Sequence, residues 1–233
     1  MHTTTVPNDP ATRAAVSPPH GRWAAVGVLA GVLGAASIWT SLEVSAAQGT
    51  DAYDDAEVLT QRLSDEVPML LAFHVTTALT AVLLVVVAAG LERRLTRDLA
   101  RTAADSLLPR VAGLGLLLVS VAALLGSGLN TEFVFLLGQE EQLVPENAAF
   151  YAHWVATIPW LWVGAGVSAL CVAAVALRHR ALPRWLGWAS LALGGLTLLL
   201  GVSPLQYMAG MTGPIWLLVA MTGLLRDERS TRR

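Results

Sequence analysis

The chain has 233 residues, of which 55% are hydrophobic and only 14% are charged, and its mean hydropathy is +0.58. The net charge of -2 offers no basic surface for nucleic acid, and the charged residues stand in short blocks between long uncharged runs. A run of ~20 apolar residues can cross the ~30 Å hydrocarbon core of a bilayer as a helix. Composition therefore leaves no room for a separate soluble domain and predicts an all-α integral membrane protein.

The first half of the chain contains three of the predicted spans. Residues 1–22 form a polar, proline-containing tail that we expect to be disordered, because it has too little apolar content to bury. The first span, 23–42, is too long for a signal peptide and is expected to be retained. The second span, 67–91, follows an acidic loop, and the third, 111–130, is rich in small residues that let helices approach closely in lipid. The arginine-rich segment 92–110 is expected to include a short helix along the membrane surface.

The fourth span, 147–177, is uncharged but holds a histidine, three tryptophans and a proline. Pro159 lacks an N–H group, so it is expected to kink this helix and to free carbonyl groups near Val155 and Ala156. Such a kink would widen the outer half of the bundle.

The last two spans come from one uncharged run of 41 residues, 185–225, which is long enough for two crossings. We divide this run into 185–203 and 204–225 at Ser203-Pro204, which fit an N-cap followed by the first helical position. The final helix then contains Pro214, and a kink is expected near Gly210–Gly213.

The distribution of arginine predicts the topology. The N-terminal tail, the second and fourth loops and the C-terminal tail, 226–233, together hold fourteen of the fifteen arginines, and Arg62 is the exception. Cytoplasmic segments collect basic residues, so both termini are expected in the cytoplasm, with six transmembrane helices in a bacterial plasma membrane. The exclusive use of arginine over lysine is typical of a high-GC genome such as an actinobacterial one.

The sequence carries none of the P-loop, HExxH, CxxC, GxSxG or dinucleotide-binding motifs, so candidate sites rest on polar residues within the spans. His74 and His153 are expected at similar depth in the outer half of the bundle, and ionisable residues in a membrane usually face an interior cavity. We predict a ligand pocket there. Its candidate residues are His74, Thr77, Asn130, Glu132, His153, Thr157, Trp160, Gln206 and Tyr207.

Several interpretations of this pocket stay open. In the simplest interpretation, each histidine bonds to a threonine or a backbone carbonyl of a neighbouring helix and has no further role. The leading functional hypothesis is a non-catalytic protein that binds a lipid, a small hydrophobic molecule or a membrane partner. The alternative is a haem- or metal-dependent membrane oxidoreductase using His74 and His153, with Glu132 or Glu43 as a further metal ligand. Transport is a weaker hypothesis, because no repeat and no deep charged residue is evident. No cofactor is assigned.

Three short motifs in the second half of the chain carry a family resemblance. They are Tyr151-Ala152-His153-Trp154, the segment ALPRWLGW at 181–188, and Gly213-Pro214-Ile215-Trp216. With these motifs the chain resembles a family of uncharacterised actinobacterial polytopic membrane proteins over roughly residues 150–225. The resemblance implies a six-helix bundle in the plasma membrane and carries no activity or catalytic residue with it.

Overall fold

The computed structural model describes residues 22–48, 55–137 and 145–230, and within these ranges the chain forms helices and short connections without any strand. In chain order the elements are α1 (Arg22–Gln48), α2 (Ala56–Asp65), α3 (Val67–Leu99), α4 (Leu108–Leu137), α5 (Pro145–Thr157), the 3₁₀ turn η3 (Ile158–Trp160), α6 (Val163–Leu177), α7 (Arg184–Val202), the 3₁₀ turn η4 (Gln206–Met208) and α8 (Ala209–Ser230). Six stretches are long and apolar enough to cross a membrane, which confirms the predicted all-α architecture with six spans. The tail expected to be disordered lies outside the described residues, except for Arg22.

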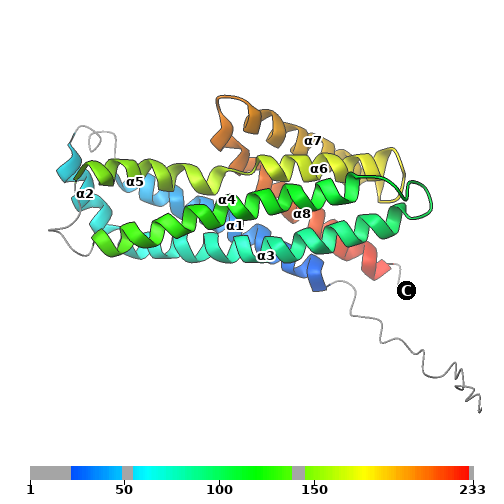
Figure 1. Cartoon of the computed structure of the whole chain (residues 1–233), viewed down its shortest axis with the longest axis horizontal. Helices are drawn as coiled ribbons and strands as arrows, with labels where there is room; N and C mark the ends of the chain where they lie inside the picture. Colours follow the sequence, from blue (N-terminus) through cyan, green and yellow to red (C-terminus); the bar gives the residue numbers. More distant parts are fainter. Residues whose placement is uncertain (1–21, 49–54, 138–144, 231–233) are drawn as a thin grey trace, which may run out of the picture.

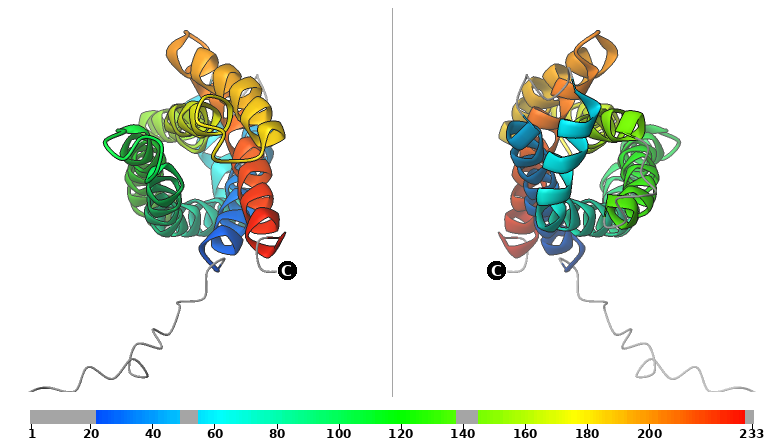
Figure 2. Two further views of the ribbon diagram at one scale, coloured as in Figure 1. Left: turned by 90° about the vertical axis from the view of Figure 1, so that its right-hand side faces the viewer. Right: turned by 90° about the vertical axis from the view of Figure 1, so that its left-hand side faces the viewer.

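The helices α1, α3, α4, α6 and α8 form a ring when the bundle is viewed along its axis (Figure 2). Around this ring, α3 packs between α1 and α4, α6 packs against α4 and α8, and α1 closes the ring against α8. The helix α7 lies outside the ring, against α6 and α8.

Figure 1 shows that α1 begins and α8 ends at the same end of the bundle, where the α3–α4 and α6–α7 connections also lie. We call this the arginine end, because every described arginine except Arg62 belongs to it, and we call the opposite end the α2 end.

Small residues allow the helices to approach closely, as the glycines of the third span predict. A Cβ atom added to Gly164 of α6 would collide with the backbone carbonyl oxygen of Gly115 in α4. At the same crossing, the Ser168 hydroxyl donates a hydrogen bond to the carbonyl oxygen of Ala112, 2.7 Å away. Close backbone packing and interhelical hydrogen bonds of this kind stabilise helix pairs in lipid, because lipid tails are as apolar as the side chains and the hydrophobic effect does not bring the helices together.

Tryptophan rings occupy the space above glycines on other helices. The pairs are Trp23 over Gly90, Trp160 over Gly210, Trp162 over Gly34 and Gly213, and Trp185 over Gly223. Each glycine provides a flat backbone surface against which an indole packs, so the glycines determine how closely the helices lie around α6 and α8.

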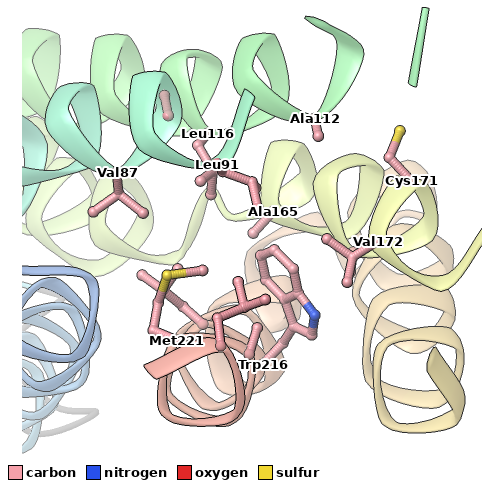
Figure 3. Close-up of a cluster of buried hydrophobic side chains, with 14 of the residues drawn as sticks. Val87, Leu91, Ala112, Leu116, Ala165, Cys171, Val172, Trp216 and Met221 are labelled. Carbon is pink, nitrogen blue, oxygen red and sulfur yellow. The ribbon is translucent and has the colours of Figure 1, made fainter. Parts of the chain in front are cut away.

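The buried side chains form two separate hydrophobic cores. The first fills the ring toward the arginine end, where Leu91 of α3, Leu116 of α4, Val172 of α6 and Trp216 of α8 meet (Figure 3). The second core lies at the α2 end and joins α2 and α5 to the ends of α1, α3 and α4. Its buried members are Val44, Leu59, Leu63, Leu70, Phe73, Phe133, Leu137, Ala148, Tyr151, Ala152 and Val155.

The short helix α2 was not predicted from the sequence, where its residues were interpreted as an acidic loop. The Asp55 side chain accepts hydrogen bonds from the N–H groups of Glu57 and Val58, which caps the start of the helix. Leu59 and Leu63, one turn apart, are fully buried in the second core. The aspartate cap and this leucine pair were the sequence signals for α2.

The expected surface helix within 92–110 is wrong in its first part, because α3 continues without interruption to Leu99. An ion-pair cluster explains the continuation. Arg94 is 9% exposed, and its guanidinium group lies 2.6 Å from the carboxylate of Asp98 one turn later and 2.7 Å from that of Asp227 on α8. The cluster satisfies a buried charge and attaches the end of α3 to α8.

The boundary predicted between the last two helices also differs from the structure. Ser203 ends α7 rather than starting the next helix, and its hydroxyl accepts a hydrogen bond from the N–H group of Leu205 at 3.1 Å. A serine followed by proline can begin a turn as well as a helix, and here the turn forms. The last helix starts only at Ala209 and is unbroken through Pro214.

Candidate functional site

The fourth span is interrupted, which is a larger change than the predicted kink at Pro159. The helix α5 ends at Thr157, η3 follows, and α6 begins at Val163. Between them Leu161 has φ −79° and ψ 72°, and the N–H group of Trp162 donates to the carbonyl oxygen of Trp160 at 2.9 Å, as in an inverse γ-turn.

Side chains satisfy two of the carbonyl groups at the interruption, those of Val155 and Pro159. Pro159 cannot donate to Val155, and the Ser41 hydroxyl of α1 donates to that carbonyl oxygen instead, at 2.8 Å. The indole N–H of Trp162 donates to the carbonyl oxygen of Pro159, at 2.9 Å. The prediction that Pro159 frees the carbonyl of Val155 is therefore confirmed, and its partner is a serine from another helix. Non-helical backbone at membrane depth is tolerated where it is buried in protein in this way.

Buried hydroxyl groups lie beside the interruption, between the two hydrophobic cores. The Thr77 hydroxyl donates to the carbonyl oxygen of Phe73 at 2.7 Å, and it lies 2.5 Å from the Ser37 hydroxyl of α1. Because the hydrogen of Thr77 is used by Phe73, Ser37 must be the donor to Thr77. Thr80 donates to the carbonyl oxygen of Thr76 at 2.7 Å. Thr77, a predicted site residue, is thus part of a buried layer of hydroxyls.

A cavity of about 10 Å³ adjoins these hydroxyls, which is room for a single water molecule. Since the three hydroxyl hydrogens already have acceptors in the protein, the side chains offer this cavity oxygen lone pairs. The cavity is too small for a lipid or a cofactor. Its lining residues are Gly34, Ser37, Thr77, Thr80, Val119, Ala123, Ile158, Pro159, Leu161 and Trp162.

Asn130 contributes to the second core. The Tyr151 hydroxyl donates to the side-chain oxygen of Asn130, the Asn130 amide lies 3.5 Å from the carbonyl oxygen of Leu70, and both side chains are fully buried. The Tyr151 ring stacks on Phe133 with ring centres 4.6 Å apart. These contacts occupy Asn130 in holding α3, α4 and α5 together.

The two histidines lie in different surroundings. His74 of α3 is half-buried, and its Nδ1 atom is buried without a hydrogen-bond partner among the described residues. His153 of α5 is exposed. The helix α3 packs mainly against α1 and α4, whereas α5 packs mainly against α2. This arrangement gives no support to a haem or metal shared by the two side chains.

Acidic groups do not complete a metal site in the described part of the chain. Glu43 and Glu132 are exposed, and the described residues contain no group of three or more histidine, cysteine, aspartate or glutamate side chains able to hold a metal ion. The Thr157 hydroxyl is exposed and donates to the backbone carbonyl of His153 within its own helix, at 2.8 Å.

Trp160, Gln206 and Tyr207 meet where the interruption contacts the α7–α8 hairpin. Trp160 is buried, and its ring lies over Gly210 at the start of α8. The turns η3 and η4 are in contact, and Gln206 and Tyr207 of η4 are exposed. His153 and Thr157 of α5 are exposed as well, and they precede η3 in the chain. We call the exposed residues Gln206 and Tyr207 the tip surface.

The hydroxyl layer includes residues that were not named from the sequence, namely Ser37, Ser41 and Thr80. Their spacing was a usable signal, because Ser37 and Ser41 are one turn apart on α1, as Thr77 and Thr80 are on α3. Hydroxyl residues on one face of two apolar helices indicate a buried polar contact between them.

Comparisons with known proteins give no relative for this chain. No family model matches the sequence, and neither a curated protein nor a solved structure matches it.

Proposed function

We propose that the arginine end faces the cytoplasm and that the α2 end faces outward, in the plasma membrane of a bacterium. The support is the segregation of charge, since α1 begins and α8 ends among arginines. The resemblance to uncharacterised actinobacterial membrane proteins belongs to this proposal as well.

Helix lengths indicate where the tip surface lies in the bilayer. The 15 residues of α6 extend ~22 Å from the arginine end, so a hydrocarbon core of ~30 Å reaches ~8 Å beyond the start of α6. Gly201 of α7 packs against Val163, the first residue of α6, so the α7–α8 hairpin ends at the level of the interruption. The 13 residues of α5 continue ~20 Å farther. The tip surface is then in the outer leaflet, near the lipid headgroups.

In this proposal the protein is non-catalytic and binds a lipid or another amphiphilic molecule of the outer leaflet at the tip surface. The observation that carries it is the exposure of two hydrogen-bonding side chains, Gln206 and Tyr207, on the turn η4, where the α7–α8 hairpin contacts the interrupted helix at η3. At the headgroup level these side chains can bond to the polar part of an amphiphile, whose apolar tail extends into the hydrocarbon core. A neutral polar headgroup with an apolar tail matches this surface.

Native mass spectrometry of the protein, released from the membrane without full delipidation, tests this function. We expect a bound amphiphile in the wild type and a roughly thirtyfold weaker affinity in the Gln206→Ala/Tyr207→Ala variant, since each of the two lost hydrogen bonds is worth about 1 kcal/mol. Trp39→Ala is the matched control, because Trp39 is an exposed aromatic residue on α1 near the same level. A wild type without a bound molecule, or equal occupancy in all three proteins, contradicts the proposal.

A further inference from the structure

The connection between α6 and α7 is the most basic surface of the described chain. Residues 178–184 contain three arginines and no acidic residue. Arg178, Arg180 and Arg184 are exposed, and none of their side chains forms a hydrogen bond or ion pair with another described residue. In the α3–α4 region, by contrast, Asp98 lies between Arg94 and Arg97. Three guanidinium groups therefore lack an anionic partner within the described protein.

The backbone holds one of these arginines in an unusual conformation. Arg180 has φ 52°, the one positive value among the described residues other than glycine. This conformation closes the end of α6, where the N–H group of Ala181 bonds to the carbonyl oxygen of Val175 at 3.2 Å. Glycine adopts it without strain, and an arginine does so at a cost. The side chain of Arg180 is exposed, so packing does not offset that cost.

An apolar stripe continues from these arginines along the outer face of α7. Trp188 follows Arg184 by one turn and is 61% exposed, and Leu199 and Val202 near the other end are 65% and 71% exposed. Between them, a Cβ atom added to Gly195 would meet nothing within 4 Å, so the stripe has a shallow gap there. Because α7 lies outside the ring, no described helix covers this face.

We propose that this surface binds one anionic phospholipid, with its phosphate at Arg178, Arg180 and Arg184 and an acyl chain along α7. Guanidinium groups pair with phosphate oxygens through two parallel hydrogen bonds, and the Trp188 indole suits the glycerol level, where amphipathic rings lie. The charge of the turn selects an anionic headgroup over a zwitterionic one. This site is at the opposite end of α7 from the tip surface and does not depend on it.

The test compares phosphatidylglycerol with phosphatidylcholine, each titrated into the detergent-purified full chain, with binding followed by native mass spectrometry and thermal shift. The site variant is Arg178→Gln/Arg180→Gly/Arg184→Gln. The control variant, Arg93→Gln/Arg101→Gln/Arg110→Gln, removes three exposed charges from the same end of the bundle. A basic residue near an anionic headgroup is worth about fivefold in affinity, so the site variant should lose about a hundredfold for phosphatidylglycerol and the control variant less than fivefold.

The single variant Arg180→Gly separates binding from folding. It relieves the positive φ, so its melting temperature without lipid should equal or exceed that of the wild type, while its affinity for phosphatidylglycerol falls about fivefold. Equal affinity of the wild type for the two lipids, or equal losses in the two triple variants, overturns the proposal. Stabilisation by inorganic phosphate alone that is lost in the site variant also overturns it, because the ligand would then be a free anion.

Discussion

At the arginine end, the α7–α8 hairpin is entered through a turn with three exposed guanidinium groups, whereas at the other end it turns through Gln206 and Tyr207 without any charge. The packing of the two hydrophobic cores differs as well. The arginine-end core contains close backbone contacts and indole rings packed over glycines. The α2-end core contains an aromatic stack beside a buried Tyr151–Asn130 hydrogen bond. The hydroxyl layer and the interrupted fourth span lie between the two cores.

The two halves are therefore stabilised by different interactions. Near the arginine end the helices touch closely, so a substitution that adds atoms should lower the free energy of unfolding by a steric clash. At the α2 end buried polar groups bond to each other, so a substitution that removes one of them should lower the free energy of unfolding. Substitutions that add or remove single groups can therefore test the comparison.

The largest expected effect is from Gly164→Ala at the α4–α6 crossing. The new methyl group would collide with the carbonyl oxygen of Gly115, and a backbone cannot move aside as a side chain can, so we expect a loss of about 3 kcal/mol in unfolding free energy. Gly128→Ala is the control, since a Cβ atom there meets nothing within 4 Å and should stabilise α4 by about 0.5 kcal/mol. Thermal melting in detergent measures the stability of both variants, and similar melting temperatures for the two would contradict a steric clash at Gly164.

Arg94→Gln should have the next largest effect. It leaves the carboxylates of Asp98 and Asp227 without their shared cation at a site where Arg94 is 9% exposed, and we expect a loss of about 2–3 kcal/mol. The neighbouring exposed residue gives the control Arg93→Gln, with an expected change within about 0.5 kcal/mol. Equal melting temperatures for these two variants would show that the cluster does not hold α3 to α8.

Tyr151→Phe tests the polar pair of the α2-end core. Removal of the hydroxyl leaves the buried side-chain oxygen of Asn130 without its donor, and we expect a loss of about 2 kcal/mol. The double variant Tyr151→Phe/Asn130→Leu should lose less than the sum of its single changes, because neither polar group is then left alone. Additive losses in this cycle would argue against the hydrogen bond.

Ser41→Ala has the smallest expected effect, about 1 kcal/mol. It removes the donor to the freed carbonyl of Val155 and a long, 3.4 Å acceptor contact of the Trp160 indole N–H, while the indole of Trp162 still satisfies Pro159. Ser45→Ala is the control, since the Ser45 hydroxyl donates to the backbone carbonyl oxygen of Ser41 within α1 and does not involve the Ser41 side chain. Hydrogen exchange in α5 should rise in the first variant and not in the second. Unchanged exchange in both would show that α1 does not stabilise the interruption.

The sequence was sufficient for the six spans and for the freed carbonyl of Val155, because uncharged length and proline chemistry act locally. It did not show that Asn130 is occupied by Tyr151, or that His153 is exposed while His74 is half-buried. Those outcomes depend on how each helix is rotated in the bundle, and apolar residues on every face of a lipid-facing helix leave that rotation undetermined. The extension of α3 depended on Asp227, more than a hundred residues later in the chain.

The most direct test of the proposed contrast between the two ends of the hairpin is a single native mass spectrometry experiment on three proteins released from the same membrane. We expect Gln206→Ala/Tyr207→Ala to lose a bound neutral amphiphile and to keep an anionic phospholipid. We expect the reverse for Arg178→Gln/Arg180→Gly/Arg184→Gln, with the wild type holding both molecules. If the two variants lose the same molecules, or if neither differs from the wild type, the two ends of the hairpin do not bind different lipids.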